Sequence, residues 1–346
     1  MRYSFFLLLT LSLTLSCCEN PEISTNADDF FNIEENNAVL PVWIRGNTSS
    51  GKIILFLQGG PASPAIDFAR VDYPGWRKTL EKDFAIAYFD YRGVGNKQGT
   101  FDLNTVSYGQ YMKDIHKILL FLKAKYNNPE LFILGHSWGG YLAYHYLLRY
   151  QSVTSVKGFI SADGSITTDY EAIRWLYRKA YLGRITTEFI NAQKDVAFWM
   201  DVQTWIDATD VIDTDEEKMQ WNIYVAKATA EADYPVGTSD YLKVAFFSPY
   251  NILSYLATGK DEVVSNKLFE EEKDFHILDQ INHITLPVLF ITGQYDDVAP
   301  PEELQVAYER IGSVNKHFTV INDAGHESFL NSPIEFHKRV VDFINQ

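Results

Sequence analysis

A serine flanked by glycines is the first residue with an evident chemical use. Ser137 lies between Gly135 and Gly139 in a G-x-S-x-G pattern, directly after an apolar run and before a helical stretch. A serine held on a sharp strand-to-helix turn needs small neighbours, and the turn lifts its hydroxyl above the sheet. The pattern therefore predicts that Ser137 is a nucleophile and that His136, beside it, faces elsewhere.

A serine hydroxyl is a poor nucleophile at neutral pH, so it requires a histidine base and a carboxylate that orients the imidazole. Of the eight histidines, His326 follows the last predicted strand, in a loop able to reach back over the sheet. Asp296 follows the strand before it and is the favoured acid. Asp297 is its neighbouring rival, and Asp163 is a weaker alternative. The chain order of Ser137, Asp296 and His326 is the one that accompanies this serine turn.

Attack on a carbonyl creates an oxyanion, which needs fixed donors, commonly two backbone N–H groups. Trp138 follows the serine and is predicted to supply one. The other is predicted to come from the loop after the first apolar run, where a glycine pair precedes Pro61. Gly60 is the predicted donor because glycines allow close approach of the backbone and proline has no N–H.

Short apolar runs alternate with helical stretches from Val39 onward, the pattern of a mostly parallel sheet covered by helices on both faces. Continuous apolar runs are typical of strands that are buried on both sides. Strands are predicted at 53–57, 84–89, 131–134, 156–161, 288–292 and 318–321, and helices notably at 108–126, 140–150 and 334–344.

The alternation stops for roughly 110 residues that are rich in Trp and Tyr and resemble successive helices. Two pairs have the spacing of a capping box that starts a helix, Thr168 with Glu171 and Thr214 with Glu217. The sequence thus predicts an α/β core in two parts, 38–163 and 284–346, with a helical cap inserted at 164–283.

Composition excludes several classes of protein. The 346 residues are 46% hydrophobic and 22% charged without repeats, which excludes collagen, coiled coils and disordered chains. Forty-five acidic residues against 30 basic ones give a net charge of -15, which repels phosphate backbones and disfavours nucleic acid as a partner. No motif with metal-ligand spacing occurs, so neither a metal nor another cofactor is predicted.

The N-terminus has the layout of an export signal. An apolar run at 5–15 follows one basic residue and is too short to span a bilayer. It ends at Cys17 and Cys18, the only cysteines, in a segment that resembles the lipid-attachment site of bacterial lipoproteins. We expect a signal peptide over 1–17, a polar tether over 18–37, and a lipid anchor to the cell envelope through one of the two cysteines.

The chain resembles the α/β-hydrolases, and within them the proline iminopeptidase branch of serine aminopeptidases. The motifs that carry this resemblance are the Gly59–Pro61 loop, the segment 90–95, the Gly135–Gly140 turn, the Gly-x-Tyr-Asp that ends at Asp296, and the Gly325–His326 pair. The resemblance implies an α/β-hydrolase fold with a helical cap, and structural rather than reactive roles for Asp90 and Arg92. It also implies removal of an N-terminal residue, often proline, with acidic cap residues holding the free ammonium group.

The cap departs from the family pattern. It lacks the Trp-x-x-Trp-Glu signature that carries one amine-binding carboxylate, and Gln58 and Ala62 replace the usual His and Gly around the glycine pair. Acidic candidates in the cap are Asp201, Asp207, Glu216, Glu217, Glu231 and Asp233, although a charged helix surface is the favoured interpretation for each.

The leading hypothesis is a serine hydrolase of the proline iminopeptidase type that acts on short peptides outside the cytoplasm. A carboxylesterase or other acyl hydrolase is the alternative, because the same residues would serve an ester equally well. A catalytically silent lipoprotein that uses the cleft for binding is the competitor from another class.

Overall fold

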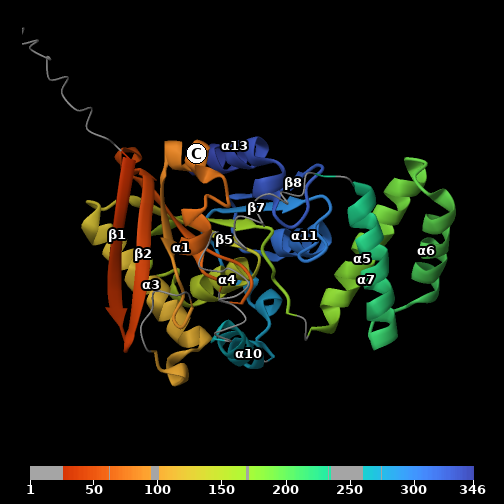
Figure 1. Ribbon diagram of the computed structural model, residues 1–346, viewed down its shortest axis with the longest axis horizontal. Coiled ribbons are helices and arrows are strands. Elements are labelled where there is room, and N and C mark those ends of the chain that lie inside the picture. Colours follow the sequence, from red (N-terminus) through yellow and green to blue (C-terminus); the bar gives the residue numbers. More distant parts are fainter. Residues whose placement is uncertain are drawn as a thin grey trace, which may run out of the picture.

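An eight-stranded sheet forms the centre of the protein (Figure 1). The computed structural model describes residues 26–61, 63–94, 101–168, 171–232, 234, 260–273 and 275–346. Residues 1–25 lie outside these ranges. They include the predicted signal peptide, both cysteines and the first part of the predicted tether. The strands are β1 (Asn26–Glu35), β2 (Ala38–Asn47), β3 (Lys52–Leu57), β4 (Ala85–Phe89), β5 (Glu130–His136), β6 (Val156–Ala162), β7 (Val288–Gly293) and β8 (Lys316–Ile321).

The strand order is β1-β2-β4-β3-β5-β6-β7-β8. Strands β3 to β8 run parallel to one another, whereas β2 is antiparallel to both of its neighbours, β1 and β4. All six predicted strands are present, and the predicted mostly parallel sheet is confirmed. Parallel strands end at the same edge, so the segments that follow β5, β7 and β8 meet there.

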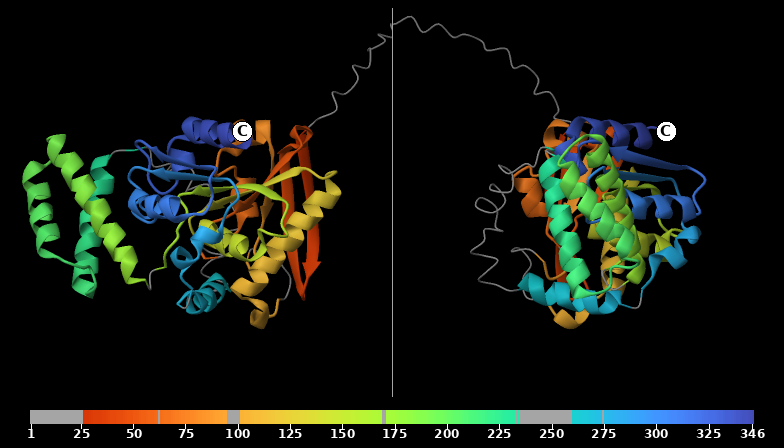
Figure 2. Two further views of the ribbon diagram at one scale, coloured as in Figure 1. Left: turned by 180° about the vertical axis from the view of Figure 1, so that it is seen from behind. Right: turned by 90° about the vertical axis from the view of Figure 1, so that its right-hand side faces the viewer.

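Helices cover both faces of the sheet (Figure 2). One face carries α1 (Ala65–Arg70), α2 (Leu80–Asp83), α12 (Ser328–Asn331) and α13 (Pro333–Ile344), and the other carries α3 (Tyr108–Lys125), α4 (Trp138–Tyr150) and α11 (Pro301–Arg310). Short 3-10 turns lie at Thr48–Ser50, Trp76–Lys78, Leu103–Thr105, Ile277–Asp279 and Ile281–His283.

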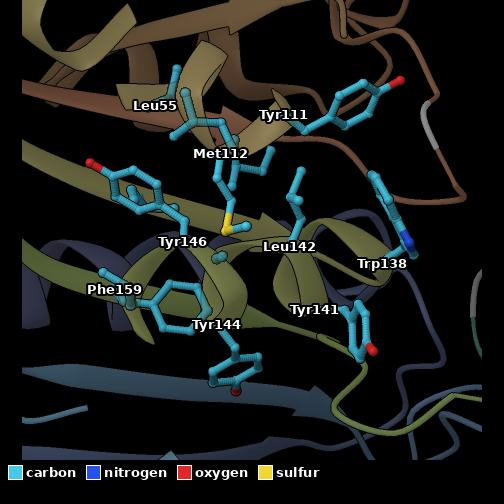
Figure 3. Packing of buried hydrophobic residues seen from close by; sticks show 14 of the residues in the cluster. Leu55, Tyr111, Met112, Trp138, Tyr141, Leu142, Tyr144, Tyr146 and Phe159 are labelled. Atoms are coloured by element: carbon cyan, nitrogen blue, oxygen red, sulfur yellow. The ribbon is translucent and has the colours of Figure 1, made fainter. Parts of the chain in front are cut away.

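Successive side chains of each strand point to opposite faces of the sheet, so the hydrophobic core lies in two parts, one on each face. In β3, Ile53 and Leu55 pack towards α3 and α4, whereas Ile54 and Phe56 pack towards α1 and α2. Figure 3 shows Met112 of α3 beside the side chains of α4. Tyr144 of α4 contacts Phe159 of β6 edge-to-face, at 5.0 Å between ring centroids. The sheet and α4 therefore form one packed unit that fixes the start of α4.

The predicted tether over 18–37 is wrong for its second half, because residues 26–35 form β1. Asn36 and Asn37 both have positive φ and make the two-residue hairpin turn to β2. Phe31 of β1 packs on Phe121 of α3, and Ile33 is buried. The hairpin joins the sheet because these apolar side chains cover one end of α3.

Arg92 ties this hairpin to the core and is fully buried. It donates to both carboxylate oxygens of Asp114 at 2.8 and 2.9 Å, and to the carbonyls of Glu35 and Asn36. Asp90 accepts a hydrogen bond from the backbone N–H of Ile66. Both contacts agree with the structural roles that the family resemblance implies.

The described segment between β6 and β7 is helical. It contains α5 (Ala172–Asn191), α6 (Val196–Ala208), α7 (Asp215–Ala232) and α10 (Lys260–Glu272). Helices α5, α6 and α7 stand together at the side of the molecule, beyond α11, with a buried core of their own, whereas α10 lies near α4 (Figures 1 and 2). Within the ranges described, no helix is both long and apolar enough to cross a membrane.

One of the two predicted capping boxes forms in full. The Thr214 hydroxyl accepts from the Glu217 backbone N–H, and the Glu217 carboxylate accepts from the Thr214 N–H, at the start of α7. At the other site the Glu171 carboxylate accepts from the Thr168 N–H. Helix α5 nevertheless begins later, after Glu171, so Thr168 is not its N-cap residue.

Candidate active site

Ser137 occupies the turn between β5 and α4. Its φ and ψ are 53° and −125°, a conformation that costs a residue with a side chain on the order of 1–3 kcal/mol. The turn is held by hydrogen bonds from the Ser137 N–H to the Ala162 carbonyl and from the Ser165 N–H to the Ser137 carbonyl. The hydroxyl is thereby fixed at the carboxyl edge of the sheet, as predicted.

The glycines around Ser137 are required by close backbone approach. A Cβ atom at Gly135 would lie 2.6 Å from the Gly139 carbonyl oxygen, and one at Gly139 would lie 2.0 Å from the Leu57 carbonyl oxygen. A Cβ atom at Gly59 would come within 2.7 Å of the Ser137 Cβ. Small residues thus allow β3, β5 and α4 to meet around the serine.

The structure brings together the three residues predicted as nucleophile, base and acid. His326 Nε2 lies 2.9 Å from Ser137 Oγ, and His326 Nδ1 lies 3.0 Å from both carboxylate oxygens of Asp296. Asp296 is fully buried and also accepts hydrogen bonds from the N–H groups of Val298 and Ala299, each at 2.9 Å. Of the two rival carboxylates, Asp296 and not Asp297 contacts the imidazole.

Electrostatics favour the protonated imidazole. Burial lowers the pKa of His326, but the charge and hydrogen bond of Asp296 outweigh it and raise that pKa to about 9. Burial raises the pKa of Asp297, and the nearby charge of Asp296 raises it further. The arrangement can therefore accept a proton from Ser137 and stabilise the resulting imidazolium.

His136 does not face away from the site, contrary to the prediction. Its Nε2 lies 3.0 Å from the His326 carbonyl oxygen, and the two rings are 5.1 Å apart. Burial, with a further contribution from His326, lowers the pKa of His136 to about 3. A neutral His136 can donate from Nε2 to that carbonyl, so it supports the backbone of the loop that carries His326.

Asp163, the weaker candidate for the acid, supports the site without touching His326. It is fully buried and accepts hydrogen bonds from the N–H of Gly293 and from both the N–H and hydroxyl of Ser328. Burial raises its pKa well above the usual range, and the charge of Asp296 adds to that shift. The carboxylate joins the end of β7 to the loop after His326.

Gly60 and Trp138 both border a pocket of about 200 Å³ beside Ser137. Gly60 has a φ of 51°, which glycine adopts without strain. Trp138 is the first residue of α4, so its N–H has no acceptor within the helix. Both predicted donors therefore lie in the wall of the pocket that contains Ser137, one in the loop after β3 and one at the start of α4.

The pocket wall also contains Glu272, which the sequence analysis did not single out. Glu272 is 4% exposed, and its Oε1 accepts from Trp138 Nε1 at 2.7 Å and from the Tyr108 hydroxyl. Burial, then the charge of Glu272, raises the pKa of Tyr108 well above its usual range, which keeps the phenol a donor. A buried carboxylate thus lies in the same pocket as Ser137.

The cap carboxylates considered from sequence lie elsewhere. Glu231 accepts from Trp199 Nε1 and forms an ion pair with Lys227, and Glu217 serves the capping box. The remaining ones are either exposed on cap helices, as are Asp201, Asp207 and Glu216, or outside the described residues, as is Asp233. Among the described residues that line the pocket, none of these carboxylates is present.

Comparison with known proteins places the chain in a family. A sequence profile of the α/β-hydrolase fold matches residues 52–333. The chain is 22% identical over 303 residues to a probable aminopeptidase, YbaC, of Bacillus subtilis, with 85% of this chain and 89% of that protein covered. It is 23% identical over 300 residues to a proline iminopeptidase of Heyndrickxia coagulans, with 85% and 91% covered.

Solved structures share the fold. The proline iminopeptidase of Mycobacterium smegmatis superposes with a TM-score of 0.60 at 17% identity, over 92% of this chain and 98% of that one. An esterase from Exiguobacterium antarcticum superposes with a TM-score of 0.58 at 19% identity, over 92% and 100%. Peptidases and esterases thus share this architecture. From the profile match, the chain belongs to the α/β-hydrolase family, and within that family it is similar to proline iminopeptidases.

Proposed function

We propose that this protein is a serine aminopeptidase of the proline iminopeptidase type, which releases proline or a small apolar residue from the N-terminus of short peptides. The observation that carries the proposal is the buried carboxylate of Glu272 in the wall of the pocket that holds Ser137. A substrate with a free N-terminal ammonium group matches this charge, whereas a simple ester has no group that requires it.

The first half of the reaction transfers the acyl group to the enzyme. Ser137 Oγ bonds to the scissile carbonyl carbon while His326 Nε2 takes the hydroxyl proton, and Asp296 holds the imidazolium. The backbone N–H groups of Gly60 and Trp138 stabilise the oxyanion. The C–N bond then breaks, and the leaving amine takes its proton from His326.

The second half releases the amino acid. Water attacks the acyl carbon, and His326 takes one of its protons. The bond to Ser137 Oγ breaks and the hydroxyl recovers its proton from His326, so the enzyme returns to its starting state. Every proton transfer passes through His326 Nε2, the ring nitrogen that contacts Ser137 Oγ in the free enzyme.

Glu272 is the proposed partner of the substrate ammonium group. A hydrogen bond to a charged group contributes about 1.5–3 kcal/mol, and a buried carboxylate is only weakly screened by water. Trp138 links the two functions, because its indole donates to Glu272 and its backbone N–H is a proposed oxyanion donor. Recognition of the amine is thereby adjacent to the reacting carbonyl.

The test compares arylamides of proline and alanine, with free and with acetylated amines, and a short-chain nitrophenyl ester. We expect the free-amine arylamides to be cleaved, acetylation to abolish cleavage, and Ser137→Ala to be inactive on every substrate. If only the ester turns over, or if blocked and free amines react alike, the esterase alternative replaces the aminopeptidase. Loss of labelling by a fluorophosphonate in Ser137→Ala, with labelling of the wild type, would exclude a silent binding protein.

Glu272→Gln isolates the role of the carboxylate. We expect kcat/KM for the free-amine arylamides to fall about 10- to 100-fold, the equivalent of about 1.4–2.8 kcal/mol, and to fall much less for the ester. Glu270→Gln is the matched control, because Glu270 is exposed on the same helix and pairs with Lys273. An equal loss on ester and arylamide would mean that Glu272 only positions Trp138.

We also propose that the protein is exported and anchored by a lipid on Cys17 or Cys18, two residues that lie outside the described part of the chain. The support is the short apolar run that ends at the cysteine pair. Metabolic labelling with an alkyne fatty acid in a bacterial host is expected to mark the wild type. Cys17→Ala and Cys18→Ala would identify the modified residue, and labelling that survives in the double variant would refute the anchor.

A further inference from the structure

The pocket beside Ser137 carries charges of both signs. Glu272 from α10 and Arg174 from α5 both line it, and they are only 4% and 6% exposed. A carboxylate and a guanidinium in the wall of one small pocket match a ligand that bears both complementary charges.

The guanidinium of Arg174 is fixed at the pocket wall. Its Nη1 donates to the Thr167 carbonyl at 2.8 Å and its Nη2 donates to the Val298 carbonyl at 2.9 Å, and both of these residues also line the pocket. Arg174 also interacts electrostatically with the buried Glu303, whose carboxylate accepts two backbone N–H bonds from Ile166 and Thr167. The guanidinium is therefore positioned before any ligand arrives.

A hydroxyl near this end of the pocket also lacks a partner. Thr168 lines the pocket and is 4% exposed, and its Oγ1 has no hydrogen bond among the described residues. Buried hydroxyls are nearly always hydrogen-bonded. A ligand oxygen next to Arg174 would satisfy it.

We propose that the preferred substrates are dipeptides with a free C-terminal carboxylate, bound with the ammonium group at Glu272 and the carboxylate at Arg174 and Thr168. This inference rests on the proposed function and names its substrate class. An extended dipeptide spans about 7 Å between its termini, the width of a compact cavity of about 200 Å³. Ligand pockets commonly measure about 300–1,000 Å³, so this pocket favours a short substrate.

The test compares an alanyl or prolyl dipeptide with the same dipeptide as its C-terminal amide, beside the free-amine arylamide. We expect kcat/KM of the wild type to be at least about tenfold higher for the free carboxylate, mainly through a lower KM, because an ion pair to a fixed guanidinium is lost in the amide. Arg174→Gln is expected to bring this ratio close to one. Arg174→Lys, which keeps the charge but loses the fork of donors, should give an intermediate ratio.

Lys179→Gln is the matched control, because it removes one positive charge from the same helix at a residue whose Nζ donates to the Asp210 carbonyl in an exposed contact. It is expected to leave the ratio unchanged. Thermal unfolding of Arg174→Gln separates recognition from folding, since a merely structural arginine would lower kcat/KM for all three substrates by the same factor and keep their ratio.

The outcomes distinguish this inference from the proposed function. If the arylamide is cleaved but the dipeptide and its amide react alike, the aminopeptidase stands and the dipeptide inference is overturned. If neither the arylamide nor the dipeptide nor its amide is cleaved, the proposed function fails and the inference fails with it. A ratio that survives in Arg174→Gln would also overturn the assignment to Arg174.

Discussion

Asp163 accepts two hydrogen bonds from Ser328, one from its backbone N–H at 3.0 Å and one from its hydroxyl at 2.7 Å. Ser328 is two residues after His326, and the other oxygen of Asp163 accepts from the N–H of Gly293, three residues before Asp296. One buried carboxylate therefore fixes the two loops that carry the proposed base and acid. It positions them without touching substrate.

Asp163→Asn is expected to lower both stability and activity. The amide of the variant can accept on one side only, so one buried N–H donor loses its partner, at a cost of about 1–3 kcal/mol in the free energy of unfolding. A displaced His326 should reduce kcat about 10- to 100-fold, because catalysis is sensitive to shifts of about 1 Å. Urea unfolding and arylamide kinetics measure the two effects.

Ser328→Ala is the milder companion variant. It removes the hydroxyl donor but keeps the N–H bond to Asp163, so we expect a loss of about 1 kcal/mol in stability and little change in kcat. Equal kcat for Asp163→Asn and the wild type would show that Asp163 does not position the loops.

The raised pKa of His326 predicts an alkaline pH dependence. The base must be neutral, and with its pKa near 9 the imidazole is mostly protonated at pH 7. For the nitrophenyl ester, which has no amine of its own to titrate, we therefore expect kcat/KM to rise with pH through a pKa above the ordinary value of 6.5 and towards 9. Glu327→Gln should move this limb to lower pH, because the Glu327 carboxylate is among the charges that raise the His326 pKa. A limb at or below 6.5 in the wild type would contradict the electrostatic account.

The same shift affects folding with the opposite sign. Because the folded state favours the protonated imidazole, His326 contributes stability that is fully present below its unfolded pKa of about 6.5 and is lost as the pH rises towards 9. Free energies of unfolding at pH 6 and pH 9, compared between the wild type and His326→Gln, test this dependence. The difference between the two proteins should be smaller at pH 9.

The backbone strain at Ser137 predicts that an inactive variant which relieves the strain is more stable than an inactive variant which keeps it. Its φ of 53° costs on the order of 1–3 kcal/mol for a residue with a Cβ. Glycine avoids this cost but loses about 0.5–1 kcal/mol in chain entropy. Ser137→Gly should therefore be inactive yet more stable to urea than Ser137→Ala, which is inactive and still strained. Identical midpoints for the two variants would show that the turn stores no strain.

The sequence predicted the parts of the fold that are buried on both faces. Strands β3 to β7 are short apolar runs because helices cover both sides of them. Strand β1 has one exposed face at the sheet edge, so Asp28 and Asp29 mix with Phe31 and the segment resembles a polar tether. The Asn-Asn pair that makes its turn is the local signal that identifies the hairpin.

The candidate site could likewise be predicted only in part. Ser137, Asp296 and His326 follow strands of a parallel sheet, so their order in the chain was sufficient to predict their proximity. Glu272 is the last of three consecutive glutamates, and only the docking of α10 decides which of them is buried. Glu270 is exposed and pairs with Lys273, whereas Glu272 contacts Trp138. The sequence alone does not determine how α10 docks on the core.

The hairpin of β1 and β2 yields a final prediction, on a truncated chain. A protein that begins at residue 38 keeps the predicted core but loses β1, whereas one that begins at residue 26 keeps the hairpin. Truncation at 38 exposes the core that Ile33 covers and removes the Glu35 and Asn36 carbonyls that Arg92 binds. We expect the shorter chain to lose at least about 3 kcal/mol in its free energy of unfolding. It should also aggregate, because β2 becomes an unpaired edge strand.

Urea unfolding followed by circular dichroism compares the two chains. Equal midpoints would mean that residues 26–37 are a tether, and a lower midpoint for the shorter chain would place the start of the folded domain at β1.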